Sequence, residues 1–329
     1  MDAKIPGIHH VTALAGDPQQ NVDFYVGLLG LRLVKLTVNF DDPTTYHLYY
    51  GDGIGTPGTI MTFFPWPGAR RGRRGAGQTT TTAFSVPADA LDYWLDRLAG
   101  PGVYTEEPTT RFGDRVITFY DPDGLRLELV ANGQDARSGW LEGSVPHEYA
   151  IRGFHGVELS ERSLQRTATL LTDRLGFRLV GQDGNRTRYE VGDGGPGSLV
   201  DVVEQPGEQL GIVAVGTVHH IAWRTPDDAQ QVAWRESLDR AGYNVTPVMD
   251  RQYFHSIYFR EPGGVLFEIA TDPPGFGKDE PVEQLGNDLK LPPWLEPVRA
   301  RVEEALPTLN VPGVGALPRV RMSDVEKIR

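Results

Sequence analysis

The 329-residue sequence contains no cysteine, which excludes disulfides, thiolate nucleophiles and zinc or iron–sulfur sites built from cysteine. Any metal ion must therefore be held by imidazole, carboxylate or backbone oxygen atoms. Basic residues are in deficit, and the net charge of −12 disfavours nonspecific binding to nucleic acid or to an anionic membrane. The N-terminus has no apolar run after a basic start, and no stretch of about 18 apolar residues occurs elsewhere. We expect a cytoplasmic protein with no nucleic-acid and no membrane partner.

A unit of strand, helix, glycine and further strands recurs four times along the chain. GLRLV at 30–34 is echoed by GFRLV at 176–180, and ITFYDPDGLRLELV at 117–130 is echoed by IYFREPGGVLFEIA at 257–270. The last two segments each contain a tight turn between apolar runs, which indicates a β-hairpin. We number these units modules one to four, and they span 7–66, 79–131, 152–204 and 217–271.

The pattern of the modules predicts an α+β fold. Each module reads βαβββ, and one helix for three or four strands leaves one face of each sheet uncovered by its own helix. We therefore expect paired modules that form two half-open barrels with helices outside. By position in the chain, modules one and two lie in 1–131, a linker covers 132–151, modules three and four lie in 152–271, and a C-terminal extension covers 272–329.

Paired βαβββ modules with a histidine on the first strand and a glutamate on the last resemble the vicinal oxygen chelate superfamily, which includes glyoxalase I and extradiol ring-cleaving dioxygenases. The opening HHVT, AGDPQQNVDFY and LGLRLVKLTVNFDDPTTYHLYYGD is similar to hydroquinone-type ring-cleaving dioxygenases. The resemblance implies a metal-dependent enzyme whose metal ligands come from equivalent positions of the modules.

Aligning the modules gives the candidate ligands. The first-strand position holds His10, Thr81, His155 and His220, and the last-strand position holds Met61, Glu128, Asp201 and Glu268. Histidine doublets occur in modules one and four, and residues adjacent on a strand point to opposite faces. Because His10 and His220 share the more polar faces, the alternation selects them over His9 and His219. With Glu268 they match the 2-His-1-carboxylate triad of non-heme Fe(II) oxygenases.

The sequence leaves the pairing of modules open. If modules three and four share a barrel, the metal set is His155, Asp201, His220 and Glu268, as in a glyoxalase-type isomerase. If modules one and four share a barrel, the set is His10, His220 and Glu268. The restriction of the doublets to modules one and four favours the second arrangement, which the resemblance also implies. Glu128, His155 and Asp201 would then be a vestigial site.

Further residues are expected beside the metal. Tyr258 precedes Glu268 by ten residues on the adjoining hairpin strand and is predicted to point inward as a proton donor or acceptor. The resemblance implies that Arg251, Thr12, His9 and His219 lie near the substrate, although strand alternation conflicts with this for the two histidines.

These features lead to one main hypothesis and two alternatives. The main hypothesis is a ring-cleaving dioxygenase that uses Fe(II), or Mn(II) in its place, to insert O₂ into a small aromatic diphenol. The alternatives are a glyoxalase-type metal-dependent isomerase or lyase, and a non-catalytic small-molecule binding protein of the same fold. The C-terminal extension is expected to pack across a barrel mouth or against a partner subunit. The second arrangement would make the protein a homo-oligomer.

Overall fold

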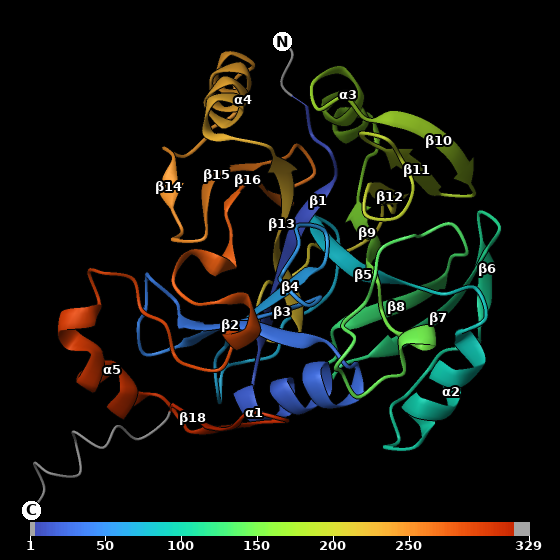
Figure 1. Ribbon diagram of the computed structural model, residues 1–329. Coiled ribbons are helices and arrows are strands. Elements are labelled where there is room, and N and C mark those ends of the chain that lie inside the picture. The colour runs from blue at the N-terminus through green and yellow to red at the C-terminus, as the bar shows by residue number, and fades with distance from the viewer. Residues whose placement is uncertain (1–3, 319–329) are drawn as a thin grey trace, which may run out of the picture.

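The computed structural model describes residues 4–318, which form two eight-stranded sheets (Figure 1). The first sheet has the order β14-β15-β16-β13-β1-β4-β3-β2, and the second has the order β10-β11-β12-β9-β5-β8-β7-β6. The strands of the first sheet are β1 (Ile8–Ala15), β2 (Arg32–Val38), β3 (Tyr46–Gly51), β4 (Ile60–Pro65), β13 (Thr217–Thr225), β14 (Met249–Asp250), β15 (Phe254–Arg260) and β16 (Leu266–Pro274). Those of the second are β5 (Gln78–Val86), β6 (Thr109–Arg111), β7 (Asp114–Tyr120), β8 (Arg126–Ala131), β9 (Gly153–Glu161), β10 (Arg178–Asp183), β11 (Arg186–Glu190) and β12 (Leu199–Glu204).

The helices lie outside the sheets (Figure 1). They are α1 (Pro18–Val22), which continues as the π-helical turn η1 (Asp23–Leu28), α2 (Leu91–Ala99), α3 (Gln165–Asp173), α4 (Asp228–Arg240) and α5 (Arg299–Ala305). Short 3₁₀ turns are η2 (His147–Tyr149), η3 (Phe276–Lys278), η4 (Val282–Gln284) and η5 (Glu296–Val298), and β17 (Leu309–Val311) pairs with β18 (Gly315–Leu317).

The local sequence explains where the first helix, α1, begins and ends. The Asp17 carboxylate accepts hydrogen bonds from the Gln19 and Gln20 backbone N–H groups, and Gly30, with φ of +72°, follows its end.

Each sheet is built from two modules. Antiparallel pairing of β1 with β13 joins modules one and four, and antiparallel pairing of β5 with β9 joins modules two and three. Each half of the chain, 1–131 and 152–271, thus gives one module to each sheet. The predicted α+β fold of paired βαβββ modules is confirmed, with the pairing that the histidine doublets favoured.

Apolar residues on the outward face of each sheet pack under the helices. Trp223, Phe267 and Ile269 are fully buried, together with Trp234 and Leu238 of α4. Phe267 and Ile269 flank Glu268 on β16, so alternation along this strand turns Glu268 toward the concave side. Along each strand, the residues between those that pack under the helices therefore point into the barrel interior.

The C-terminal extension packs along the first sheet, where Figure 1 shows it beside β2. The buried Lys35 ammonium group forms ion pairs with Asp279, at 2.7 Å, and with Glu280. The ring of Phe276 contacts the rings of Tyr49 and Tyr253. The extension thus fills part of the first barrel, while its residues 319–329 lie outside the described part of the chain.

A buried pair of carboxyl groups joins modules three and four. The Thr167 hydroxyl lies 2.6 Å from a carboxyl oxygen of Glu161 and 2.6 Å from one of Glu261. Since a hydroxyl carries one proton, it can donate to one of these oxygens only and must accept from the other group. Burial, reinforced by Glu261, raises the pKa of Glu161 to about 8. The structure therefore favours a protonated carboxyl group here.

This pair predicts a pH dependence of stability. The pKa of Glu161 is higher in the folded chain than in the unfolded one. The contribution of this group to the stability of the fold is therefore complete below about pH 4.5 and is lost as the pH rises toward 8. The free energy of unfolding should fall by at most about 1.4 kcal/mol per pH unit in this window. Urea unfolding of wild type and Glu161→Gln between pH 5 and 8 checks this, since glutamine cannot ionise. An equal slope in both proteins would contradict the assignment.

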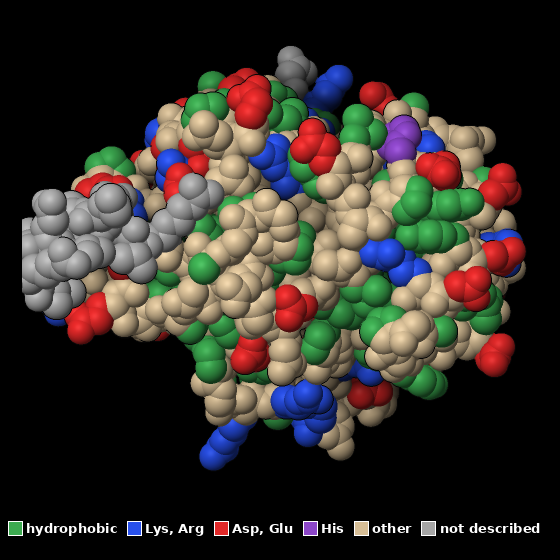
Figure 2. Space-filling view, turned by 60° about the horizontal axis from the view of Figure 1, so that its bottom comes forward, with side chains coloured by type: hydrophobic (Ala, Val, Ile, Leu, Met, Phe, Trp, Pro, Cys, Tyr) green, Lys and Arg blue, Asp and Glu red, His purple; other side chains and the backbone are tan. Residues whose placement is uncertain are grey.

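The surface carries charges of both signs. On the face shown in Figure 2, acidic and basic side chains are interspersed with small apolar patches. Within residues 4–318, no helix has the length and apolar character needed to cross a membrane.

Candidate metal centre

Three buried side chains of the first barrel converge on one point. The Nε2 atoms of His10 and His220 are 3.3 Å apart, and the Glu268 Oε2 atom lies 3.4 Å from the first and 2.9 Å from the second. Strand register brings them together, because Thr12 of β1 faces His220 of β13, and Ala222 of β13 faces Glu268 of β16. Two histidines that are 210 residues apart in the chain are thus brought to one site.

The electrostatics of these groups suit a cation. Burial alone would raise the pKa of Glu268, but His10 and His220 hold it well below its usual range, so the carboxylate is ionised. Burial lowers the pKa of His220 despite the opposing effect of Glu268. Ser256 donates a hydrogen bond to Glu268 Oε1, whereas Oε2 is buried and receives none of regular geometry. An ionised carboxylate oxygen and two imidazole nitrogens with converging lone pairs are the donors that a divalent transition metal takes, so these residues fit such an ion.

The first histidine of each doublet does not follow strand alternation, because both strands contain a β-bulge. His9 is the extra residue of β1 between Ile8 and His10, and His219 is the extra residue of β13 between Val218 and His220. A bulge re-aims the side chains around it. Each extra ring consequently lies beside its neighbour, with Nδ1 to Nδ1 distances of 2.9 Å for the first doublet and 2.7 Å for the second. Strand alternation alone therefore does not predict where the rings of His9 and His219 lie.

These contacts can set the orientation of the neighbouring rings. Burial and the ring of His10 lower the pKa of His9, and burial and the ring of His220 lower that of His219 to about 3. Both rings are therefore neutral, and the Nδ1 atom of each can accept a hydrogen bond from the Nδ1–H group of the neighbouring His10 or His220. That arrangement leaves the Nε2 lone pairs of His10 and His220 free at the centre, as second-sphere partners do in metal sites.

A cavity that opens to solvent is lined by two of the three residues, His10 and His220. Thr12, Tyr258, Arg251 and His219 line it, whereas His9 is absent from its wall. The Arg251 guanidinium group donates to the Tyr258 hydroxyl at 3.3 Å and lies 3.4 Å from Asp41. Tyr258 faces Glu268 directly across the β15–β16 pair.

Several cavity residues were not identified from the sequence, and most are aromatic or carry an imidazole. They are Asn39, Phe40, Asp41, His47, Tyr49, Phe64, Trp66 and Phe254. The alternation of His47 and Tyr49 along one strand was a usable signal, since both residues face inward on β3. The ring centroid of Phe254 lies 5.0 Å from that of His10 although β15 and β1 are not neighbours in the sheet, so its position had no sequence signal.

Strand register also corrects two positions of the module alignment. Glu268 faces Ala222, two residues after His220, and Glu128 faces Ala83, two residues after Thr81. By the same rule Thr62, not Met61, occupies the carboxylate position of module one, because it faces Thr12. Gly156, not His155, occupies the histidine position of module three, because Asp201 faces Glu158. His155 is instead the bulge residue of β9 and corresponds to His9 and His219.

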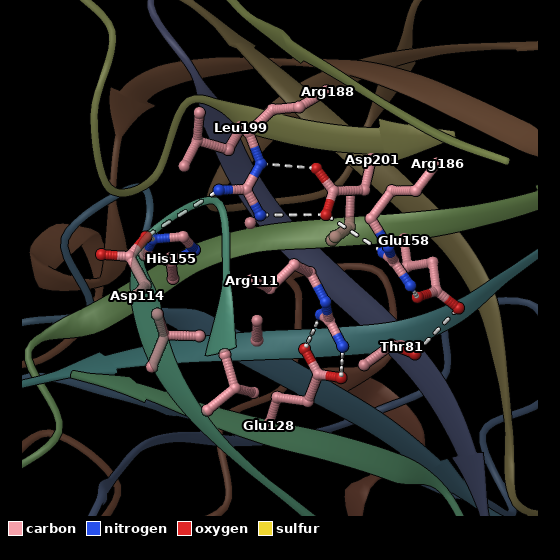
Figure 3. A pocket seen from close by; sticks show the side chains of 15 residues that line it. Thr81, Arg111, Asp114, Glu128, His155, Glu158, Arg186, Arg188, Leu199 and Asp201 are labelled. Atoms are coloured by element: carbon pink, nitrogen blue, oxygen red, sulfur yellow. Dashed lines mark hydrogen bonds and ion pairs between the residues drawn. The ribbon is translucent and has the colours of Figure 1, made fainter. Parts of the chain in front are cut away.

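The alternative four-residue metal set is divided between the two sheets. His155 and Asp201 belong to the second barrel, whereas His220 and Glu268 belong to the first. Within the second barrel, arginines cover the acidic groups (Figure 3). Arg111 donates to both oxygens of Glu128, at 2.8 and 3.1 Å, and Arg188 donates to both oxygens of Asp201, at 2.7 and 2.9 Å. Bidentate guanidinium groups thus occupy the lone pairs that a metal would need.

The barrels differ in how equivalent residues are used. Arg111 precedes Glu128 by 17 residues, and Arg251 precedes Glu268 by the same number. Arg111 caps its glutamate, whereas Arg251 turns to Tyr258 and leaves Glu268 to the two histidines. Only one of the two barrels therefore presents an uncovered carboxylate beside two imidazoles in the described part of the chain.

Comparison with known proteins identifies the family. The family model described as Glyoxalase/Bleomycin resistance protein/Dioxygenase superfamily matches residues 7–129 and 153–269. MhqO of Bacillus subtilis, named as a ring-cleaving dioxygenase, is 49% identical over 93% of this chain and 97% of its own length. The chlorohydroquinone/hydroquinone 1,2-dioxygenase of Sphingobium indicum is 37% identical over 94% of this chain and 97% of its own length.

Solved structures give the same grouping. A crystal structure described as a dioxygenase from Bacillus subtilis superposes with a TM-score of 0.90 at 48% identity, covering 94% of this chain and 99% of that one. Glyoxalase I from Zea mays, at 16% identity and a TM-score of 0.63 over 81% of this chain and 92% of its own, shares the fold. The chain belongs to the Glyoxalase/Bleomycin resistance protein/Dioxygenase superfamily, within the group of ring-cleaving dioxygenases that these relatives form.

Proposed function

We propose that this protein opens the ring of a hydroquinone-like diphenol with O₂, using Fe(II) held by His10, His220 and Glu268. The observation that carries the proposal is the convergence of these three donors, with no hydrogen bond of regular geometry to Glu268 Oε2, beside a cavity lined by His10, His220 and several aromatic side chains. A bound Fe(II) would supply a template for the phenol oxygen and O₂ and a path for electrons between them.

The other side chains of the cavity would bind the ring and handle protons. Phe40, Phe64, Trp66 and Phe254 provide apolar surface for a flat ring. Burial, with the charge of Glu268, raises the pKa of Tyr258, so its hydroxyl keeps its proton at neutral pH. Because Arg251 already donates to the Tyr258 oxygen, the Tyr258 proton is available to a ligand in the cavity. Tyr258 is thus placed to donate to a developing anion, and Arg251 to hold Tyr258.

The glyoxalase-type alternative is less well supported by the same site. An octahedral isomerase site would draw a fourth ligand from module one, and the residue at that position is Thr62, whose hydroxyl bonds to Thr12 and His47. A neutral hydroxyl engaged in two hydrogen bonds is a poor substitute for a carboxylate. This observation supports the three-residue donor set over the four-residue one.

Oxygen uptake tests the proposal. Protein reconstituted anaerobically with Fe(II) is expected to consume one O₂ for each hydroquinone converted to a ring-opened product, and catalase should return no oxygen. Reconstitution with Mn(II) in parallel identifies the preferred metal. Quinone formation with hydrogen peroxide release would contradict the proposal, and isomerisation of a glutathione hemithioacetal without O₂ uptake would favour the glyoxalase-type alternative.

A further inference from the structure

Four side chains form a hydrogen-bonded chain in the cavity wall built by β1, β3 and β4. The Tyr49 hydroxyl lies 2.8 Å from His47 Nδ1, and His47 Nε2 lies 2.9 Å from the Thr62 hydroxyl. The Thr62 hydroxyl lies 3.0 Å from that of Thr12. Thr12, Thr62 and Tyr49 are buried, and Thr12, His47 and Tyr49 line the cavity over the metal centre. None of the four belongs to the converging set of His10, His220 and Glu268.

The chain of contacts has a fixed direction. Among the described residues, His47 Nδ1 is the one hydrogen-bond partner of the Tyr49 hydroxyl, so the buried Tyr49 proton must be donated there. Burial, with His10 and His220 nearby, lowers the pKa of His47, so the ring is neutral and carries its proton on Nε2. That proton goes to Thr62, and Thr62 in turn donates to Thr12. The Thr12 proton is then free for a group inside the cavity.

Repeat symmetry places this chain where module four supports its metal ligand. Tyr49 faces Thr62 as Tyr258 faces Glu268. Two residues before each tyrosine, His47 contacts Thr62 and Ser256 donates to Glu268. The same strand positions thus hold a carboxylate ready for a metal in module four and a relay of hydroxyl groups in module one.

We propose that Tyr49, His47 and Thr62 act as positioning residues that hold the Thr12 hydroxyl as a hydrogen-bond donor to an oxygen of the bound diphenol. The inference rests on the proposed function, because it assumes a phenol oxygen at the centre. Without Tyr49, the neutral His47 ring can carry its proton on Nδ1 instead. Thr62 would then donate to His47 and Thr12 to Thr62, and Thr12 would present lone pairs, which repel a phenolate oxygen.

A double-mutant cycle on the iron-loaded enzyme tests the relay. Thr12→Val and Tyr49→Phe are each expected to raise KM for hydroquinone about tenfold, the effect of losing one hydrogen bond to an ionised group. The double variant should match Thr12→Val alone, since Tyr49 acts through Thr12. Tyr50→Phe is the matched control, because the Tyr50 hydroxyl donates to Asn21 and lies outside the cavity wall.

A second pair of variants separates orientation from folding. His47→Gln keeps an acceptor for Tyr49 and a donor for Thr62 and should retain KM within about threefold, whereas His47→Leu should behave as Tyr49→Phe does. Multiplying effects of Thr12→Val and Tyr49→Phe, or equal KM values in His47→Gln and His47→Leu, would overturn the relay while leaving the proposed function intact. A wild-type enzyme that takes up no O₂ with hydroquinone would overturn both.

Discussion

Replacing Glu268 with glutamine is expected to abolish retention of the metal ion and to lower turnover more than about 100-fold. Mutating a residue that only supports a metal ligand already costs about 10- to 100-fold, and loss of the ligand itself should cost more. The glutamine has the same size but no charge, so two imidazoles remain without the anion that balances a divalent cation. Metal analysis of the purified variant and O₂ uptake measure the effect directly.

The repeat supplies matched controls for this experiment. Glu128 occupies the position of Glu268 in module two but is held by Arg111, so Glu128→Gln should keep the metal and turnover. Likewise His10→Ala should lose both, whereas His155→Ala should keep both. Loss of the metal in His155→Ala with retention in His10→Ala would contradict the assignment of the first barrel.

Replacing Tyr258 with phenylalanine is expected to lower kcat about 100-fold or more while the metal content stays at one ion per chain, since a positioned acid contributes about 10²- to 10⁴-fold. The hydroxyl is the group that Arg251 orients toward the cavity, and phenylalanine keeps the ring and its packing. Stopped assays at saturating hydroquinone give kcat separately from KM.

A neighbouring tyrosine controls for loss of a buried hydroxyl. Tyr253 bonds to Asp279 of the C-terminal extension and does not line the cavity, so Tyr253→Phe should change stability and not kcat. A kcat of Tyr258→Phe within about twofold of wild type would show that another group donates the proton, because loss of a general acid lowers the rate by about 100-fold or more.

The four modules and the candidate metal ligands could be predicted from patterns that are visible in the sequence itself. Spacing of the repeat placed Glu268 in the same position as Glu128, and the doublets marked modules one and four as partners. Alternation correctly turned Glu268 and Tyr258 inward, because β15 and β16 pair without irregularity between Ser256 and Arg260.

What escaped prediction depends on contacts between strands. The bulges at His9 and His219 arise from the pairing of β1 with β13, which are about 200 residues apart, so alternation along either strand alone did not predict the contacts of these rings with His10 and His220. A one-residue slip put Met61 in place of Thr62, because the loop before β4 hides the register of that strand. The arginines of the second barrel were overlooked since Arg111 and Arg188 reach their carboxylates across strands.

Insertion of O₂ into an aromatic ring at the His10, His220 and Glu268 site is tested most directly with labelled oxygen. Iron-loaded protein would be mixed with hydroquinone under ¹⁸O₂ for a single turnover and the product analysed by mass spectrometry. We expect a ring-opened acid that carries ¹⁸O in wild type and in His155→Ala, and no such product in His10→Ala. An unlabelled quinone from wild type, or a labelled ring-opened acid from His10→Ala, would contradict it.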